Sequence, residues 1–321
     1  MRIDAHMHVN FNNYNAEDII DYLNKNKFDC CWLMTWEEVD CGKWHYEHLS
    51  VEDVYETYLL YPSRIIPMYA PDPHQEDAAK KLMYWYNKGI KGCAELKATL
   101  NWKSDKLTSL LSTVSELKLP LTFHMEEAKE ILVPVKLDNF FETFCLAVMR
   151  SNRLFGLPKK IINILVEAYQ PFMKWKKKRT HLFPGYMLDF SSLAVILNDY
   201  PNINFIGHGP LFWKHISADA ANSCSMYPKG VIKGEGLTCE FLRHYPNLYA
   251  DISGESCFNA FNRDHNFSKK FISEFSHKLI FGTDNSTLGH ERLLTSFDLS
   301  AGAMKQILGE NAANLIDYQK V

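Results

Sequence analysis

Short apolar segments rich in β-forming residues alternate with longer amphipathic segments along the whole chain. The strand-like segments are eight in number and cover residues 2–9, 28–36, 64–70, 90–97, 119–125, 203–208, 247–253 and 278–284. Helical periodicity is clearest over residues 16–26, 76–88, 104–117, 187–199 and 290–297. Strands that alternate with helices form parallel sheets, and eight such units close into a barrel. The sequence therefore predicts an α/β fold, a (β/α)8 TIM barrel.

One interval departs from this alternation, between the fifth and sixth predicted strands. It contains two stretches with helical patterns, 137–151 and 160–174, and a basic run over 174–179. We interpret the basic run as a solvated helix end, and the alternative is an edge near the site mouth that attracts anions. We expect a helical insertion over 127–182, at the barrel rim where loops vary most. The rival architecture, a doubly wound sheet, normally has a glycine-rich turn after its first strand, where this chain has His-Met-His. The prediction is one domain over residues 1–321 with one insertion.

Composition limits the partners and the compartment. The hydrophobic share of 46% and the charged share of 23% are typical of globular proteins, and a net charge of -3 gives no basic footprint for nucleic acid or an anionic membrane. No apolar run approaches the ~18 residues of a membrane span, and the first residues do not resemble a signal peptide. The eight cysteines show no CxxC spacing, which predicts free thiols in a reducing cytoplasm. We expect a cytoplasmic protein that acts on a small molecule.

His6 and His8 lie in the first predicted strand, within the sequence Ile-Asp-Ala-His-Met-His. Because side chains alternate between the faces of a strand, the two imidazoles point the same way, about 7 Å apart along the backbone. Imidazole is a common ligand of divalent metal ions. The pair alone also fits two buried histidines, so its interpretation as a metal site depends on the rest of the chain.

Residues of the types that bind metal ions also end four other predicted strands: Glu95 and Lys97, His124, His208, and Asp284. In a barrel the carboxyl ends of all strands meet at one face, so these residues are expected to converge. Nitrogen and oxygen ligands in this number suit one or two divalent cations. The candidate metal ligands are His6, His8, Glu95, His124, His208 and Asp284.

Several of these residues also have ordinary structural explanations. His124 fits a buried histidine equally well, and Asp284 fits a helix N-cap. Glu95 and Lys97 are two positions apart, so both can face the barrel mouth. A glutamate bridges two ions directly, whereas a lysine would have to be carbamylated. We favour Glu95 as the metal-facing residue and Lys97 as the substrate-facing one.

Substrate contacts are expected from the loops that follow the strands. Trp36 offers an aromatic wall for a planar or apolar substrate. Lys97 and Arg263 suit a substrate carboxylate, and Tyr227 follows the sixth strand. The predicted substrate-binding residues are Lys97, Trp36, Arg263 and Tyr227.

Four motifs resemble the amidohydrolase superfamily: Ile-Asp-Ala-His-Met-His, Phe-Ile-Gly-His-Gly-Pro, Leu-Ile-Phe-Gly-Thr-Asp and the tail Ile-Leu-Gly-Glu-Asn-Ala-Ala-Asn-Leu-Ile. The chain is similar to the amidohydrolase-related group (amidohydrolase 2 type), which also includes non-oxidative decarboxylases of aromatic and unsaturated acids. The likeness covers nearly the whole chain except residues 127–182. The segment Gly-Cys-Ala-Glu-Leu-Lys departs from the Gly-Val-Lys-Leu-His of the decarboxylases and resembles the Gly-Glu strand of TatD-type hydrolases. This departure leaves the number of metal ions open.

The resemblance implies a TIM barrel with His6, His8 and Asp284 around one metal ion. A second ion would use His124, His208 and the residue of the fourth strand between them. Zinc is the expected ion, with manganese and iron as alternatives. Homodimers are common in this family, and the apolar residues of the insertion are compatible with one.

The leading prediction is a metal-dependent hydrolase in which a metal-bound hydroxide cleaves an amide, lactone or ester-like bond. Asp284 would accept the proton of the water and pass it to the leaving group, and His208 or a second ion would polarise the carbonyl. One alternative is a metal-dependent non-oxidative decarboxylase of an aromatic or unsaturated carboxylic acid. Another is a non-catalytic metal-binding module that interacts with partners through the insertion.

Overall fold

The computed structural model describes residues 1–12, 14–37, 48–134, 178–186 and 189–316. The chain divides into two compact units. One comprises Met1–Glu127 with Gly185–Val321, and the other is Ala128–Pro184. The first unit contains the parallel strands and the predicted site residues, and the second contains a two-stranded antiparallel sheet.

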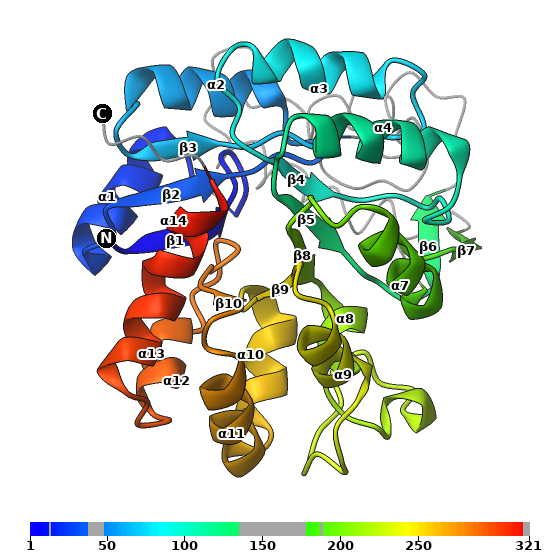
Figure 1. Ribbon diagram of the computed structural model, residues 1–321, viewed down its shortest axis with the longest axis vertical. Coiled ribbons are helices and arrows are strands. Elements are labelled where there is room, and N and C mark those ends of the chain that lie inside the picture. Colours follow the sequence, from blue (N-terminus) through cyan, green and yellow to red (C-terminus); the bar gives the residue numbers. More distant parts are fainter. Residues whose placement is uncertain (13, 38–47, 135–177, 187–188, 317–321) are drawn as a thin grey trace. The chain divides into compact units, whose positions relative to one another are not determined.

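The strands of the first unit run parallel in two sheets (Figure 1). The three-stranded sheet has the order β1 (Ile3–Met7), β2 (Cys30–Leu33) and β3 (Ile65–Pro67). The five-stranded sheet has the order β10 (Leu279–Ile280), β9 (Leu248–Asp251), β8 (Phe205–His208), β5 (Leu121–His124) and β4 (Cys93–Leu96). The eight predicted strands are confirmed, each within the range expected from the sequence.

Backbone hydrogen bonds join the two sheets at both pairs of edges. Between β1 and β10, Ala5 N donates to Phe281 O at 2.8 Å. Between β3 and β4, Lys91 N donates to Pro67 O at 2.9 Å. Each of the eight strands therefore has bonded neighbours on both sides, as the strands of a (β/α)8 barrel do.

Helices follow the strands on the outside of the sheets (Figure 1). Their bounds are α1 Ala16–Asn26, α2 Val51–Leu60, α3 Ala78–Tyr86, α4 Asp105–Glu116, α7 Phe190–Asp199, α8 Pro210–Lys214, α9 Leu237–His244, α10 Gly254–Asn262, α11 His265–Phe275, α12 His290–Thr295, α13 Ala301–Lys305 and α14 Asn311–Leu315. A 3-10 turn, η1 (Ala220–Asn222), and a π-helical turn, η2 (Gln306–Glu310), complete the set. The helices predicted over 16–26, 76–88, 104–117, 187–199 and 290–297 are confirmed as α1, α3, α4, α7 and α12.

Local sequence explains why α1 begins where it does. Asn15 Oδ1 accepts from Asp18 N at 2.9 Å, and Asp18 Oδ2 accepts from Asn15 N at 3.0 Å. This capping box satisfies two backbone donors that the first helical turn leaves without intrahelical partners. The helix then buries Ile19 and Leu23. Burial of side chains of this size contributes about 1.5–3 kcal/mol each.

The barrel strands share a buried apolar cluster with the C-terminal helix α14. Ile3, Trp32 and Ile206 belong to one buried cluster, each no more than 1% exposed. Ala312 and Leu315 of α14 belong to the same cluster. Because close-packed interiors resist deformation, the core gives the strand ends a rigid base.

The described ends of the predicted insertion form strands. β6 (Lys129–Pro134) pairs antiparallel with β7 (Lys178–Phe183). Residues 178 and 179 of the basic run therefore lie in a strand, and their interpretation as a helix end is wrong. Antiparallel pairing with β6 outweighs the local helical preference of the lysines. The helices predicted over 137–151 and 160–174 lie outside the described residues.

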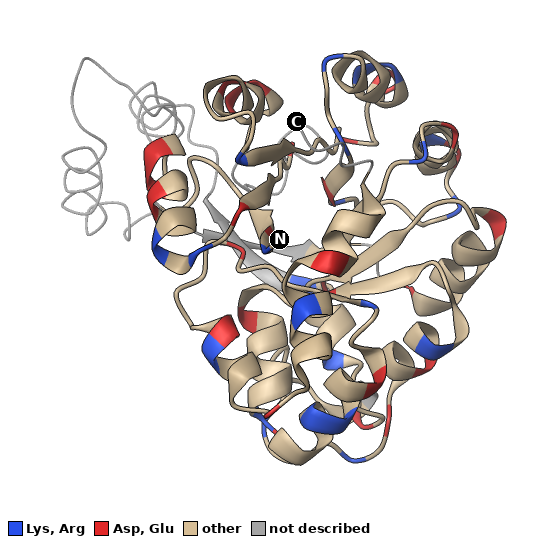
Figure 2. Ribbon diagram, turned by 60° about the vertical axis from the view of Figure 1, so that its left-hand side comes forward, with Lys and Arg blue, Asp and Glu red and all other residues tan. Residues whose placement is uncertain are grey.

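Three observations bear on compartment and partners. Within the described ranges, no helix combines the length and the apolar character needed to cross a bilayer. The described cysteines are free thiols, at positions 30, 31, 93, 224, 239 and 257. Basic and acidic residues lie side by side over the outer helices (Figure 2). The mixed charges agree with the small net charge of the sequence.

Candidate metal centre

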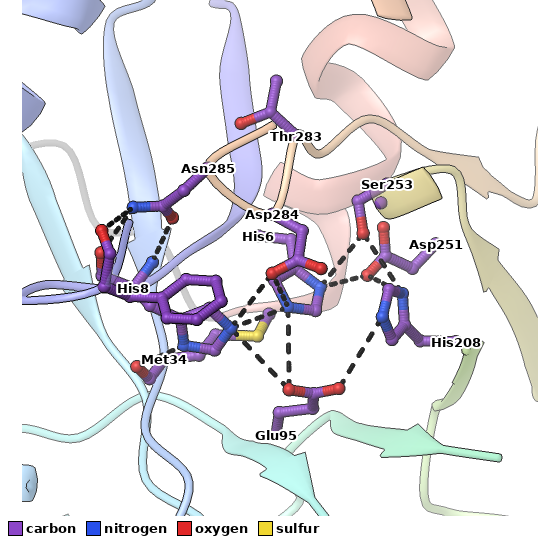
Figure 3. Close-up of polar contacts among 12 residues, drawn as sticks. His6, His8, Met34, Glu95, His208, Asp251, Ser253, Thr283, Asp284 and Asn285 are labelled. Carbon is purple, nitrogen blue, oxygen red and sulfur yellow. Dashed lines mark hydrogen bonds and ion pairs between the residues drawn. The ribbon is translucent and has the colours of Figure 1, made fainter. Parts of the chain in front are cut away.

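The strand ends bring the six predicted ligands together. His6 lies in β1, Glu95 in β4, and His124 ends β5. In the β5–β8 ladder His124 is directly opposite His208. Asp284 follows β10, and its N–H donates to His6 O at 2.8 Å. The members of this set that Figure 3 draws point toward one another.

Four of these residues form the first cluster: His6, His8, Glu95 and Asp284. His6 Nε2 and His8 Nε2 lie 3.0 Å apart. Asp284 Oδ1 lies 3.8 and 3.5 Å from these two nitrogens, and Glu95 Oε2 lies 3.8 and 3.7 Å from them. Ligands about 2.0–2.2 Å from a tetrahedral ion are roughly 3.3–3.6 Å apart. These four atoms therefore have the spacing of ligands that share one divalent cation.

Two oxygens of the first cluster are buried without a hydrogen-bond partner within the described part of the chain. They are Glu95 Oε2 and Asp284 Oδ1. Lys97 Nζ lies 3.5 Å from Glu95 Oε2, at an ion-pair distance. A buried carboxylate oxygen is destabilising unless a cation or a donor reaches it. The arrangement thus favours a cation between the carboxylates and the imidazoles.

The second cluster consists of Glu95, His124 and His208, which offer ligand atoms within 4.8 Å of one another. Its contacts differ from those of the first cluster. His124 Nδ1 makes a direct 2.7 Å hydrogen bond with Glu95 Oε1, and His208 Nε2 lies 3.7 Å from the same oxygen. Glu126 Oε2 lies 3.4 Å from the other nitrogen of His124. Glu95 therefore presents one oxygen to each cluster.

Each histidine of the first cluster has a second contact behind its ring. His8 Nδ1 donates to Met34 O at 3.0 Å. His6 Nδ1 is hydrogen-bonded to Asp251 Oδ2 and has Ser253 Oγ at 3.2 Å. Such outer partners fix the tautomer and the orientation of a ligating imidazole. With Nδ1 protonated in this way, Nε2 of each ring faces the cluster.

Asp251 and Ser253 were not among the residues predicted from the sequence. Both are buried, and both also contact His208, whose Nδ1 lies 3.3 Å from Asp251 Oδ2 and 3.1 Å from Ser253 Oγ. Asp251 ends β9, the seventh barrel strand. A carboxylate at the end of a predicted barrel strand was the signal that could have identified it.

The loop after β10 is tied to β1 by side chains on both elements. Asp4 accepts from Thr283 N at 3.0 Å and from Thr283 Oγ1 at 2.8 Å. Asn285 accepts from His8 N and donates to His8 O, both at 2.8 Å. Asp284 and Asn285 have φ of 55° and 53°, a conformation that Asn and Asp tolerate better than most residues. These bonds set the position of Asp284 relative to the histidine pair.

The two histidines of β1 differ in proton affinity. Burial lowers the pKa of His6, but the charge and hydrogen bond of Asp251 outweigh burial and raise this pKa to about 10. Burial and the neighbouring His6 hold the pKa of His8 well below its usual value. At neutral pH His6 therefore carries a proton on Nε2 that can be donated to His8 Nε2. The positive charge of His6 therefore lies in the first cluster, where the spacing of the ligand atoms fits a cation.

The two carboxylates of the first cluster also differ. Burial raises the pKa of Glu95, but the charges of Lys97 and His124 outweigh burial and hold this pKa well below its usual range. Burial raises the pKa of Asp284, and the charge of His6 opposes this effect only in part. Glu95 is thus a permanent anion, whereas Asp284 is the carboxyl group that takes up a proton more readily.

Two glycines allow the close approach of site residues. Gly254 has φ +69°, and a Cβ there would lie 3.2 Å from Asp284 Oδ2 and 3.4 Å from His208 Cε1. A Cβ at Gly282 would lie 2.6 Å from the His6 Cβ and 3.1 Å from Asp251 Oδ1. Side chains at these positions would displace the ligands of the cluster.

Lys97 and Trp36 lie beside the first cluster, as predicted for residues that contact substrate. The Lys97 ammonium lies 3.3 Å from the centroid of the Trp36 ring. The Trp36 ring is 4.5 Å from that of His8. Both side chains are buried, so the cation–π contact is made in a poorly hydrated setting where it is strongest.

An acidic rim borders this region. A small cavity next to Glu95 and Lys97 is also lined by Glu37 and Asp72. Glu37 accepts from the Tyr69 hydroxyl at 2.6 Å and from Asp72 N at 2.9 Å. These bonds hold the Glu37 carboxylate in place at the edge of the cavity.

The other two predicted substrate residues have different surroundings. Burial and the carboxylates of Glu255, Glu126 and Asp284 raise the pKa of Tyr227 to about 12. Arg263 follows the last residue of α10 and donates to Gly230 O at 2.8 Å. Its guanidinium is engaged there, and the structure does not bring it to the clusters.

No family model and no curated protein matches the sequence. Three solved structures with the same architecture are a probable 2-pyrone-4,6-dicarboxylic acid hydrolase from Acinetobacter baumannii, a dihydroxybenzoic acid decarboxylase from Polaromonas sp. JS666 and an uncharacterised TIM-barrel protein from Bordetella bronchiseptica. Their sequence identities are 14%, 14% and 11%, and their TM-scores are 0.53, 0.51 and 0.51. The matches cover 98%, 98% and 93% of this chain and 98%, 96% and 81% of the matched chains. The chain is a TIM barrel.

This TIM barrel carries its candidate ligands at the carboxyl ends of the strands, the end at which barrel enzymes place their active sites. The hydrolase structure contains bound citric acid, and the decarboxylase structure contains manganese and the inhibitor 2-nitroresorcinol. At these identities the comparison establishes the fold, and the chemistry has to be argued from the residues of the site.

Proposed function

We propose that this protein is a divalent-metal-dependent hydrolase of the amidohydrolase superfamily that cleaves an amide, lactone or ester-like bond of a small molecule. The observation that carries the proposal is the first cluster. Two imidazole nitrogens at the end of β1 lie 3.0 Å apart there, and one carboxylate oxygen from each of two other strand ends lies 3.5–3.8 Å from both nitrogens. The motifs that resemble the superfamily contain three of these four residues, namely His6, His8 and Asp284.

The donor set fits a divalent ion. Imidazole and carboxylate ligands together suit zinc, manganese and iron. Zinc is our proposed ion, and manganese, which the matched decarboxylase structure contains, is the first alternative. When bound, such an ion supplies Lewis acidity that lowers the pKa of a coordinated water toward ~7.

Asp284 is the proposed general base. Its side chain is 24% exposed, whereas that of Glu95 is 1% exposed, so Asp284 is the carboxylate that an incoming water can reach. Its raised pKa suits a group that accepts a proton from water and returns it to a leaving group. Glu95, held as an anion, is the proposed ligand between the two clusters.

His208 is proposed as a ligand of the second cluster. Its Nδ1 lies 3.3 Å from Asp251 Oδ2, and its Nε2 faces Glu95 Oε1 at 3.7 Å. A lone pair binds an ion but cannot donate a hydrogen bond to a carbonyl oxygen. The polarisation of the substrate carbonyl is therefore assigned first to a cation on this side, with His208 itself as the alternative.

Lys97, Trp36 and Tyr227 are the proposed substrate contacts. The Lys97 ammonium can form a charge-assisted hydrogen bond with a substrate carboxylate. The Trp36 ring, which packs against both Lys97 and His8, offers a flat surface for a planar group. Arg263, bound to backbone carbonyl groups at the end of α10, has no role in the proposal.

The second candidate function is non-oxidative decarboxylation of an aromatic or unsaturated acid. It is favoured by one observation, the shared fold with a dihydroxybenzoic acid decarboxylase whose structure contains manganese. A single ion in the first cluster and a carboxylate held by Lys97 would suffice for it. Two ions that share Glu95 would instead favour hydrolysis.

The test is the metal content of the purified protein together with assays on lactones, amides and aromatic acids. We expect at least one zinc or manganese ion per chain and turnover of a lactone or amide. Release of carbon dioxide by a protein with one ion per chain would support decarboxylation as the function instead of hydrolysis. Tightly bound metal with no turnover on any of these substrates would support a non-catalytic binding module. The cytoplasmic location, the homodimer and the use of iron remain predictions.

A further inference from the structure

A single buried carboxylate lies behind imidazoles of both clusters. Asp251 Oδ2 is hydrogen-bonded to His6 Nδ1 and lies 3.3 Å from His208 Nδ1. Ser253 Oγ lies 3.2 and 3.1 Å from the same two nitrogens. Figure 3 shows Asp251 and Ser253 behind the two rings, on the side away from Glu95. His6 belongs to the first cluster and His208 to the second.

We propose that Asp251 is a positioning residue shared by the two clusters, so that loss of its carboxylate changes both His6 and His208. A carboxylate oxygen has lone pairs for more than one donor, and Asp251 Oδ2 can accept from both Nδ1–H groups. With both rings held in this tautomer, both Nε2 atoms face Glu95, at 3.8 Å for His6 and 3.7 Å for His208.

The surroundings of Asp251 hold its carboxylate in place. Asp251 is 2% exposed, and its backbone carbonyl accepts from Trp213 Nε1 at 3.0 Å. Gly282 lies across from Asp251 Oδ1, where a Cβ would come within 3.1 Å. An ionised carboxylate this deep in the barrel is stable only with hydrogen-bond donors around it. The imidazoles of His6 and His208 are those donors, and both face Oδ2.

Glu126 supplies a matched comparison within the same site. It is buried and its carboxylate lies behind one imidazole, with Oε2 3.4 Å from His124 Nε2. The geometry therefore predicts that Glu126 acts on His124 of the second cluster. A change of Asp251 and a change of Glu126 each remove one buried negative charge, but only the first reaches both clusters.

The first experiment follows histidine side chains by NMR in the full chain without added metal. We expect Asp251→Asn to alter the Nδ1–H signals of both His6 and His208, assigned with His6→Gln and His208→Gln. Glu126→Gln should alter His124 alone. A change in one of the two rings only, or in neither, overturns the proposal. If Asp251→Asn does not fold, Ser253→Ala should produce a smaller change in the same two rings.

The second experiment titrates each variant with zinc by calorimetry, and this arm rests on the proposed metal-dependent function. Loss of an outer partner of a ligating histidine weakens metal binding about 10–100-fold. We expect a loss of this size at both sites for Asp251→Asn and at one site for Glu126→Gln. Unchanged zinc affinity in Asp251→Asn overturns the proposal. If the unaltered protein binds no zinc, the proposed function fails, and the NMR result alone decides the role of Asp251.

Discussion

The two oxygens of Glu95 face different surroundings. Oε2 lies among two imidazoles and the Asp284 carboxylate at 3.7–3.8 Å from the nitrogens, without a hydrogen bond. Oε1 makes a 2.7 Å hydrogen bond with His124, whose other nitrogen faces Glu126. A hydrogen bond already satisfies Oε1, whereas Oε2 has Lys97 Nζ at an ion-pair distance of 3.5 Å but no hydrogen bond.

This difference indicates which oxygen of Glu95 is better placed to bind a cation. An ion at the first cluster does not have to displace a hydrogen bond to Glu95 Oε2. An ion at the second cluster has to displace the hydrogen bond between His124 and Glu95, which opposes its binding. We therefore expect a tight metal site on the Oε2 side of Glu95 and a weaker metal site on the Oε1 side.

The largest expected effect comes from removing one imidazole on each side. His8→Gln should abolish the tight site, because the first cluster loses one of its two nitrogen ligands. His124→Gln, the matched control, should leave the tight site intact and remove only the weaker one. Zinc titration by calorimetry measures both. Equal losses in the two variants would show that the two sides of Glu95 are not distinct.

Asp284→Asn separates binding from chemistry on the Oε2 side. An amide oxygen can still face the ion, but it cannot accept the proton of a water molecule. We expect kcat to fall by about 10²–10⁴-fold, the usual size of a general-base contribution. Metal content should stay close to that of the unaltered protein. Near-normal turnover would end the proposed role of Asp284 as the base.

Gly254→Ala should disturb both clusters, because the new side chain would crowd a residue of each. The new Cβ would lie 3.2 Å from Asp284 Oδ2 and 3.4 Å from His208 Cε1, at a φ of +69°. We expect a loss of about 1–3 kcal/mol in unfolding free energy. Gly302→Ala in α13 is the control, because its nearest contact is 3.9 Å and alanine favours a helix. Denaturant unfolding compares them, and equal stability of the two variants would contradict the account.

The smallest effect is expected at the acidic rim formed by Glu37 and Asp72, which belong to neither cluster. Burial raises the pKa of Asp72, but hydrogen bonds from His74 and Gln75 outweigh burial and lower it below its usual value. A lowered folded-state pKa stabilises the protein above the unfolded pKa, and this stability is lost as pH falls through the folded value.

Asp72→Asn should therefore reduce the unfolding free energy by about 1–2 kcal/mol at pH 7. The difference from the unaltered protein should shrink as the pH falls below about 4. Zinc affinity should not change, because Asp72 belongs to neither cluster. A stability difference that persists in acid would assign the effect to packing rather than to the charge of the carboxylate.

The sequence predicted the barrel and the convergence of the ligands because both depend on local patterns. Alternating periodicity identifies strands and helices, and parallel topology then brings strand ends together. The two-stranded sheet of β6 and β7 was missed because long-range pairing determines it, across a separation that no local pattern reports.

Other parts of the site required three-dimensional information. Arg263 follows the seventh strand in sequence, but α10 carries it about 13 Å from the start of that helix. The role of Asp251 depends on which ring nitrogens lie in front of it. The contact between His124 and Glu126 depends on side-chain orientation at the end of β5. A single sequence does not contain these relations.

The most direct test of the account is anomalous X-ray diffraction from crystals grown with zinc. The account predicts a strong peak about 2.0–2.2 Å from His6 Nε2, His8 Nε2 and an oxygen of Asp284, next to Glu95. A weaker peak between Glu95 and His208 is expected at higher zinc concentration. A strong peak only on the His124 side, or none among these residues, would contradict the central claim.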